Sequence, residues 1–157
     1  MKKNVKTYLA FIAATEAVGA VSALLTRDGV KLYNDTALKP PLSPPAIVFP
    51  VAWGVLYALM AAGASRVYLS PQSEQRTRGL RLYAVQLAMN FFWSVLFFDQ
   101  RWYLFAAIWL AVMLALIIRM TVCWYRTDKP AAYLQIPYIA WVAFAAYLNV
   151  GVWILNR

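Results

Sequence analysis

The sequence predicts an all-α integral membrane protein, built as a bundle of five transmembrane helices. Of its 157 residues, 63% are hydrophobic and only 13% are charged, which is more apolar surface than a soluble domain of this size can bury. The apolar residues also fall in five long runs, and about 20 mostly apolar residues are needed to cross a hydrocarbon layer of roughly 30 Å. We therefore expect one membrane domain over residues 1–157.

The expected spans are residues 8–25, 46–69, 80–98, 102–124 and 131–155. The first is interpreted as a span and not a secretory signal, because it is too long for the apolar centre of a signal and contains Glu16. The longest connection, residues 26–45, ends in a proline-rich segment that prevents helix continuity. It is expected to be a shaped loop that acts as a lid or binding loop, with a simple spacer as the alternative. Pro50 and Pro137 lie near the starts of the second and fifth spans, where they kink a helix or simply occupy its first turn.

The basic residues give a formal net charge of +9 but fall in the loops and at helix ends, so no nucleic-acid partner is expected. Loops on the cytoplasmic side of a membrane carry the excess of Lys and Arg. Nine basic residues lie on the side of the amino terminus and five on the other, which predicts a cytoplasmic amino terminus. The nine are Lys2, Lys3, Lys6, Arg66, Arg76, Arg78, Arg81, Arg126 and Lys129, and the five are Arg27, Lys31, Lys39, Arg101 and Arg157.

The sequence contains no His and a single Cys, Cys123. This excludes an intrachain disulfide, a zinc site, a Cys/His catalytic pair and His ligation of haem iron, and neither a metal site nor an obligatory cofactor is expected. Only Glu16, of six acidic residues, lies well inside a span, so the sequence argues against conventional acid–base catalysis. An intramembrane acid is a functional candidate, and a protonated or amide-paired carboxyl at a helix contact is an equal alternative.

Two stripes of polar and aromatic residues follow helical spacing in the third and fifth spans. They are expected to face each other across the bundle and to line a pocket for a flat, largely apolar ligand. Interhelical amide bonding is the alternative, and the spacing alone favours it. The first stripe is Gln86, Asn90, Trp93 and Phe97, and the second is Tyr138, Trp141, Ala145 and Asn149.

Three segments of the chain carry a family resemblance. Residues 39–60 read KPPLSPPAIVFPVAWGVLYALM, residues 87–98 read LAMNFFWSVLFF, and residues 137–149 read PYIAWVAFAAYLN. In order and spacing these segments resemble the translocator protein family, also called tryptophan-rich sensory proteins. The resemblance covers three of the five spans.

The resemblance implies a five-helix bundle, usually a homodimer, that binds porphyrins and other apolar ligands in a pocket closed by the first loop. The ligand is then a metal-free porphyrin, or a haem held by its ring. Small residues on two helices, Gly19 with Ala23 and Ala84 with Ala88, are candidates for a dimer contact or for packing within one bundle. The positions that match the family's pocket are Tyr33, Trp53, Asn90, Trp93, Phe97, Trp141 and Ala145, with Glu16, Gln86, Tyr138 and Asn149 as secondary candidates.

The resemblance therefore implies a membrane-embedded sensor, regulator or carrier of porphyrins or haem-like tetrapyrroles. One alternative that it also implies is an enzyme that degrades porphyrin in light, using the indoles of Trp53 and Trp141. A second is a small cation/proton antiporter that uses Glu16. Specific cholesterol recognition is not predicted, because Tyr147 has no basic residue within five positions after it, as the sterol motif of animal members requires.

Overall fold

The computed structural model describes residues 2–157, and the side chains of residues 4–157. Five stretches are long and apolar enough to cross a membrane, with α4 and η1 together forming the third and α6 and α7 the fifth. This confirms the predicted five-span architecture. The elements are α1 (Lys2–Leu25), α2 (Arg27–Thr36), α3 (Val48–Leu69), α4 (Glu74–Ser94), the π-helical segment η1 (Val95–Asp99), α5 (Tyr103–Thr127), α6 (Lys129–Tyr133) and α7 (Ile136–Leu155).

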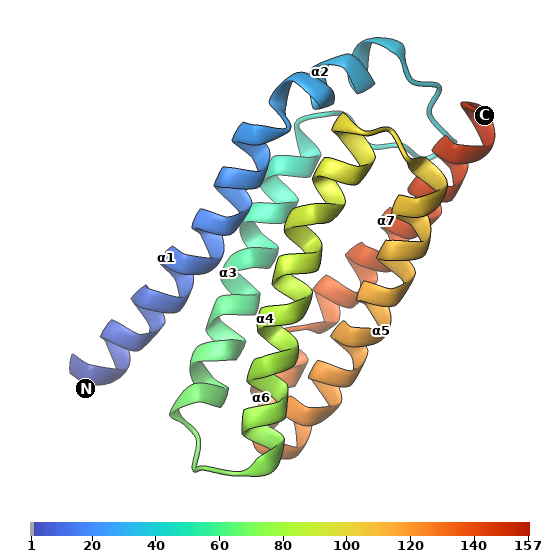
Figure 1. Cartoon of the computed structure of the whole chain (residues 1–157). Coiled ribbons are helices and arrows are strands. Elements are labelled where there is room, and N and C mark those ends of the chain that lie inside the picture. The colour runs from blue at the N-terminus through green and yellow to red at the C-terminus, as the bar shows by residue number, and fades with distance from the viewer. Residues whose placement is uncertain (1) are drawn as a thin grey trace.

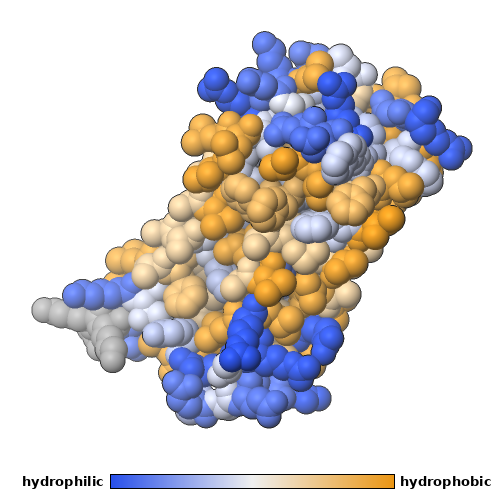
Figure 2. All heavy atoms as spheres, viewed as in Figure 1, coloured by the Kyte–Doolittle hydropathy of each residue, from blue (hydrophilic) through white to orange (hydrophobic). Residues whose placement is uncertain are grey.

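The spanning helices run side by side, and α2 lies across one end of the bundle (Figure 1). Hydrophilic residues gather at both ends of the molecule, and a hydrophobic band lies between them (Figure 2). Large apolar side chains such as Val55, Ile108 and Val112 are at least half exposed within this band. Such a surface suits contact with lipid, which is the solvent for a spanning helix.

The helices pack in a definite order around the interior. The main helix contacts are α4 with α5, α1 with α3, and α5 with α7, whereas α3 touches α7 only weakly. The core between α3, α4, α5 and α7 holds fully buried side chains such as Met60, Met113, Trp124 and Tyr138. Of the spans, α1 has the smallest buried share and lies on the outside of the bundle against α3 and α4.

Three small residues allow α1 to approach its neighbours. Thr15 hydrogen-bonds Tyr83 of α4, and the Ser22 hydroxyl donates to a backbone carbonyl of α4 at 3.3 Å. Gly19 lies so close to the Tyr57 ring of α3 that a Cβ atom there would overlap it. Gly19 therefore packs within one bundle and is not available for the dimer contact considered from the sequence.

The short helix α6 ties the last span to α3. Arg66 of α3 donates to both carboxylate oxygens of Asp128, at 2.9 and 3.1 Å, and Asp128 also accepts the backbone N–H of Ala131 at 2.9 Å. Burial acts to raise the pKa of Asp128, but the hydrogen bonds from Arg66 and Ala131 outweigh it and hold the pKa below its ordinary value. This ion pair fixes α3 and α6 together at the end of the bundle where α1 begins (Figure 1).

Several sequence expectations need correction. The connection at residues 26–45 is not free of helix, because α2 (Arg27–Thr36) occupies its first half and the prolines follow it. The third span begins at Glu74 and not at residue 80, and the fifth is interrupted between α6 and α7. Pro50 and Pro137 both lie in the first turns of their helices, so neither bends a helix interior.

Candidate ligand-binding site

A chain of buried side-chain hydrogen bonds joins α3, α4 and α7 in the centre of the bundle. The Tyr57 hydroxyl donates to Asn90 Oδ1 at 3.0 Å, and Asn90 Nδ2 donates to the Tyr138 hydroxyl at 3.0 Å. The Tyr138 hydroxyl donates in turn to Gln86 Oε1 at 2.6 Å. The two predicted stripes therefore do face each other, and their polar groups satisfy one another as interhelical bonds.

A second pairing lies nearer the end of the bundle that carries α2. The Trp93 indole N–H donates to Asn149 Oδ1 at 3.1 Å, and Asn149 Nδ2 donates to the backbone carbonyl of Tyr103 at 2.8 Å. The Trp93 ring stacks on Phe97 with centroids 5.1 Å apart. Phe97 belongs to the π-helical segment η1, a rare geometry that often marks functional positions in helices.

The helix α2 places Tyr33 over this aromatic group. The Tyr33 ring meets the rings of Phe97 and Phe98 edge-on, with centroid distances of 5.3 and 5.4 Å. The Lys39 ammonium lies 5.1 Å from the centroid of the same Tyr33 ring. Burial, and secondarily the nearby Tyr103, raises the pKa of Tyr33 to about 12, so its hydroxyl stays neutral at physiological pH. Tyr33 and Phe97 are thus brought together as the sequence suggested.

The proline-rich segment after α2 is fastened to the end of α7. Asn156 Oδ1 accepts the backbone N–H of Leu38 at 2.9 Å, and Asn156 Nδ2 donates to the Leu38 carbonyl at 2.8 Å. The Tyr147 hydroxyl donates to the carbonyl of Pro41 at 3.0 Å. Pro40 is buried against Gly151, where a Cβ atom would lie only 2.5 Å from the proline ring. The loop is therefore an ordered cover with side-chain anchors on α7.

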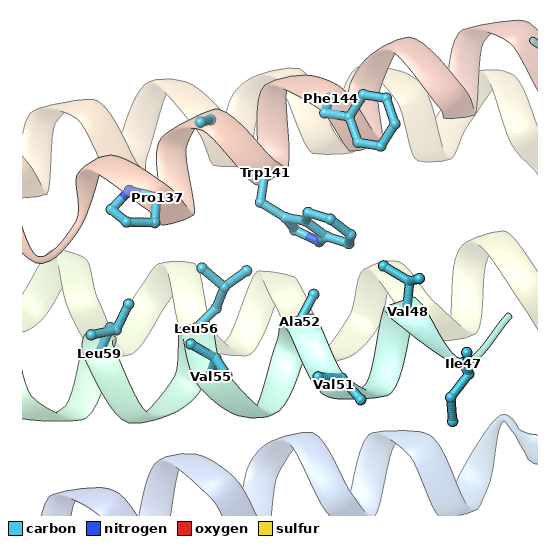
Figure 3. Close-up of a pocket in the computed structure, with 11 residues that line it drawn as sticks. Ile47, Val48, Val51, Ala52, Val55, Leu56, Leu59, Pro137, Trp141 and Phe144 are labelled. Carbon is cyan, nitrogen blue, oxygen red and sulfur yellow. The ribbon is translucent and has the colours of Figure 1, made fainter. Parts of the chain in front are cut away.

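An apolar groove opens between α3 and α7, where these helices pack weakly (Figure 3). Its volume is about 640 Å³, within the range of small-molecule sites. Trp141 projects from α7 toward α3 into this space (Figure 3). The groove is lined by Ile47, Val48, Val51, Ala52, Val55, Leu56, Leu59, Pro137, Ala140, Trp141 and Phe144.

Trp141 connects the groove to the aromatic interior. Its ring centroid lies 6.5 Å from that of Trp53 and 5.9 Å from that of Phe49, both on α3. Trp53 in turn contacts Tyr138 at 6.2 Å. The Trp141 indole N–H is buried and has no hydrogen-bond partner among the residues that the structure describes. An unpaired buried donor is costly, and a polar group of a ligand that reached this N–H would satisfy it.

The remaining predicted residues occupy different places. Ala145 is buried with 8% of its surface exposed, and it does not line the groove. Glu16 is half-buried on α1, close enough to Tyr57 for electrostatic interaction, with no hydrogen bond or ion pair in the described part of the chain. Sequence reasoning missed Phe49, Tyr57 and Phe144, although Phe49 and Tyr57 lie four residues to either side of Trp53 and so share its helix face.

The fold and this arrangement define a class: helical membrane proteins with five spans, an aromatic interior and an ordered loop across one end. The chain belongs to the TspO/MBR family, whose family model matches residues 11–154. It is 31% identical over 157 residues to the tryptophan-rich protein TspO of Chlorobaculum tepidum, with 99% of each chain covered. It is 35% identical over 149 residues to the tryptophan-rich sensory protein of Cereibacter sphaeroides (95% and 90% covered) and 36% identical over 142 residues to the translocator protein of Bos taurus (88% and 83% covered).

Proposed function

We propose that this protein binds porphyrin-type tetrapyrroles and other flat apolar ligands within the membrane, and acts as a sensor, regulator or carrier. The observation that carries the proposal is Trp141, which lines the open α3–α7 groove, packs against the ring of Trp53 and has a buried indole N–H without a partner among the described residues. A porphyrin has a large apolar face that suits the aliphatic walls and the indole ring. Its carboxylate side chains are the kind of acceptor that a buried N–H binds well.

The names of the relatives agree with such a role, since one is called a sensory protein and another a translocator protein. The proposed route is lateral, from the lipid into the groove. The ordered loop at residues 37–45 closes the aqueous end, because Asn156 and Tyr147 hold it against α7. We further propose a homodimer and a cytoplasmic amino terminus, for which the exposed Ala84 and Ala88 and the distribution of Lys and Arg are the support.

The binding test is a titration with a metal-free dicarboxylate porphyrin, followed by the absorbance of the porphyrin itself. Trp141→Phe keeps an aromatic ring but removes the N–H, and it should weaken binding about tenfold through loss of one hydrogen bond to a charged group. Trp102→Phe changes an exposed indole at the start of α5 and should leave affinity unchanged. Equal affinity in the Trp141 variant and the parent would contradict the assignment of the N–H.

A steric test addresses the groove directly. Val55 is 56% exposed and lines the groove, so Val55→Trp should fill part of it and reduce porphyrin binding strongly. Val85 is 50% exposed on the outward face of α4, and Val85→Trp adds the same bulk away from the site. Loss of binding in both variants, or in neither, would place the ligand elsewhere.

The second candidate function is light-dependent breakdown of porphyrin, favoured by the close pair of indoles. Trp53 and Trp141 meet nearly at right angles, at 86°, so a ligand against Trp141 also lies near Trp53. Under illumination, Trp53→Phe should slow porphyrin loss more than it lowers affinity. An unchanged rate of porphyrin loss in Trp53→Phe and in Trp141→Phe, with ligand bound, would exclude a role for these indoles in the chemistry.

A further inference from the structure

One basic residue does not follow the distribution expected from the sequence. Arg119 lies inside the fourth span, eight residues before the end of α5 at Thr127, and neither in a loop nor at a helix end. Its side chain is exposed, and so are the neighbouring Ile118 and Val122 on the outer face of α5. Its guanidinium has no hydrogen bond, ion pair or ring contact within residues 4–157. A lipid-facing charge at this depth is costly unless the side chain reaches the headgroup region or an anionic partner.

The helices α4 and α5 are antiparallel neighbours whose register is fixed at two levels. The Trp109 indole N–H of α5 donates to the carbonyl of Met89 on α4 at 2.8 Å. Nearer the end of the bundle where α4 begins, Gly79 of α4 lies against the indole of Trp124 on α5. Residues between these levels on the two helices therefore lie beside one another.

This register brings Arg81 of α4 to within about one helical turn of the level of Arg119. Arg81 is exposed and continues the outward stripe of Val85, Ala88 and Phe92. It lies seven residues after Glu74, so both arginines are about 10 to 12 Å inside the ends of their helices. Arg81, like Arg119, has no partner among the side chains that the structure describes.

Within residues 4–157, no carboxylate pairs with Arg81 or Arg119. Asp128, the acid at the end of α5, is held by Arg66 of α3 and by the N–H of Ala131. Arg78 and Arg126 are also exposed at this end of the two helices and add further positive charge. Glu74, the first residue of α4, is the only acid in that helix, and Asp99 of η1 lies at the opposite end of the same span. The outer face of α4 and α5 thus carries an excess of guanidinium groups.

We propose that Arg81 and Arg119 bind the phosphate of an anionic phospholipid, in the leaflet on the side of the amino terminus. Guanidinium groups bind phosphate oxygens in a bidentate manner, and long arginine side chains extend from within the hydrocarbon to headgroup level. The acyl chains lie along exposed apolar side chains beyond the two arginines, toward the middle of the bundle, such as Val85 and Phe92 of α4 and Ile108 and Val112 of α5. The excess positive charge selects a lipid with net negative charge over a zwitterionic one.

The proposal is tested by native mass spectrometry of the full chain in detergent, titrated with phosphatidylglycerol or with phosphatidylcholine. The parent should bind the first phosphatidylglycerol more tightly than phosphatidylcholine. Arg119→Gln should weaken phosphatidylglycerol binding about fivefold, and Arg81→Gln with Arg119→Gln about 25-fold. Arg119→Lys, which keeps the charge, should retain part of the affinity.

Arg27→Gln is the matched control, because it removes the same charge from an exposed position at the other end of the bundle. A similar loss in Arg27→Gln would overturn the proposal in favour of unspecific attraction. Displacement of the lipid by an equal concentration of inorganic phosphate would show a free-anion site and overturn it as well. A different outcome is that Arg119→Gln and Glu16→Gln both abolish the mass of a dimer while lipid binding stays unchanged. That outcome would mean that Arg119 pairs with Glu16 of a second copy of the chain, and it would overturn the proposal.

Discussion

Replacing Asn156 by Ala should release the proline-rich cover from α7. The substitution removes the two hydrogen bonds between the Asn156 amide and the backbone of Leu38, at 2.9 and 2.8 Å. Each exposed hydrogen bond contributes about 0.5 to 1 kcal/mol, so the closed state loses about 1 to 2 kcal/mol. The equilibrium for local opening of the loop should therefore rise about 5- to 30-fold.

Hydrogen exchange measures this change directly, because the Leu38 amide is one of the two groups bound. Asn156→Asp keeps an acceptor for this amide but loses the donor to the Leu38 carbonyl, and it should give an intermediate increase in exchange. Asn34→Ala is the control, since Asn34 bonds only the Lys39 ammonium in this region and does not touch α7. Unchanged exchange at Leu38 in Asn156→Ala, or an equal increase in Asn34→Ala, would refute the assignment of Asn156 as the anchor.

Three further substitutions test the bundle. Gly19→Ala should lower the thermal midpoint in detergent by overpacking against α3, at a cost of about 1 to 3 kcal/mol, whereas Gly54→Ala has open space and should be neutral or stabilising. The pKa of Asp128 is lowered in the fold, so its ion pair with Arg66 stabilises fully above the ordinary aspartate pKa and is lost as pH falls through the lowered value. The stability difference between the parent and Asp128→Asn should therefore shrink on acidification. Asn90→Leu should cost about 1 to 3 kcal/mol, because two buried tyrosine hydroxyls lose a partner.

The controls for these substitutions also follow from the structure. Equal thermal midpoints for the two glycine variants would show that α1 tolerates a side chain at its contact with α3. If the difference in stability between the parent and Asp128→Asn did not change with pH, protonation of Asp128 would not affect the free energy of unfolding. The exposed amide of Asn34 provides the comparison for Asn90, since its replacement should leave the midpoint unchanged.

Hydropathy predicted the spans well because lipid imposes a length and a composition on every crossing helix. It failed at α2 (Arg27–Thr36), which is too polar and too short to give that signal and ends just before the prolines. It also placed the start of the third span late, because the first turns of α4 contain Glu74, Arg76 and Arg78 and give no apolar signal. The break before α7 follows from Pro137 in its first turn, whereas hydropathy alone runs across this break because the residues on both sides of it are mostly apolar.

The facing stripes were predicted from spacing, and the bond between Asn90 and Tyr138 confirms that they face each other. Their role in binding stays a prediction, since these groups bind one another in this structure. The groove was not predicted, because it depends on how far α3 and α7 separate, and helix separation leaves no periodic signal in one sequence. The loop anchor at Asn156 was missed for a similar reason, since it joins positions 118 residues apart.

The junction between α1 and α2 has a mechanical consequence. Only Thr26 separates these helices, and its hydroxyl and its amide both bond the carbonyl of Ser22, so the turn continues the hydrogen bonding of α1. When α2 lifts from η1, the backbone must either bend at Thr26 or swing α1 with it. Because α1 is the least buried span and lies on the outside of the bundle, such a movement would change the surface that the bundle presents to the surrounding lipid.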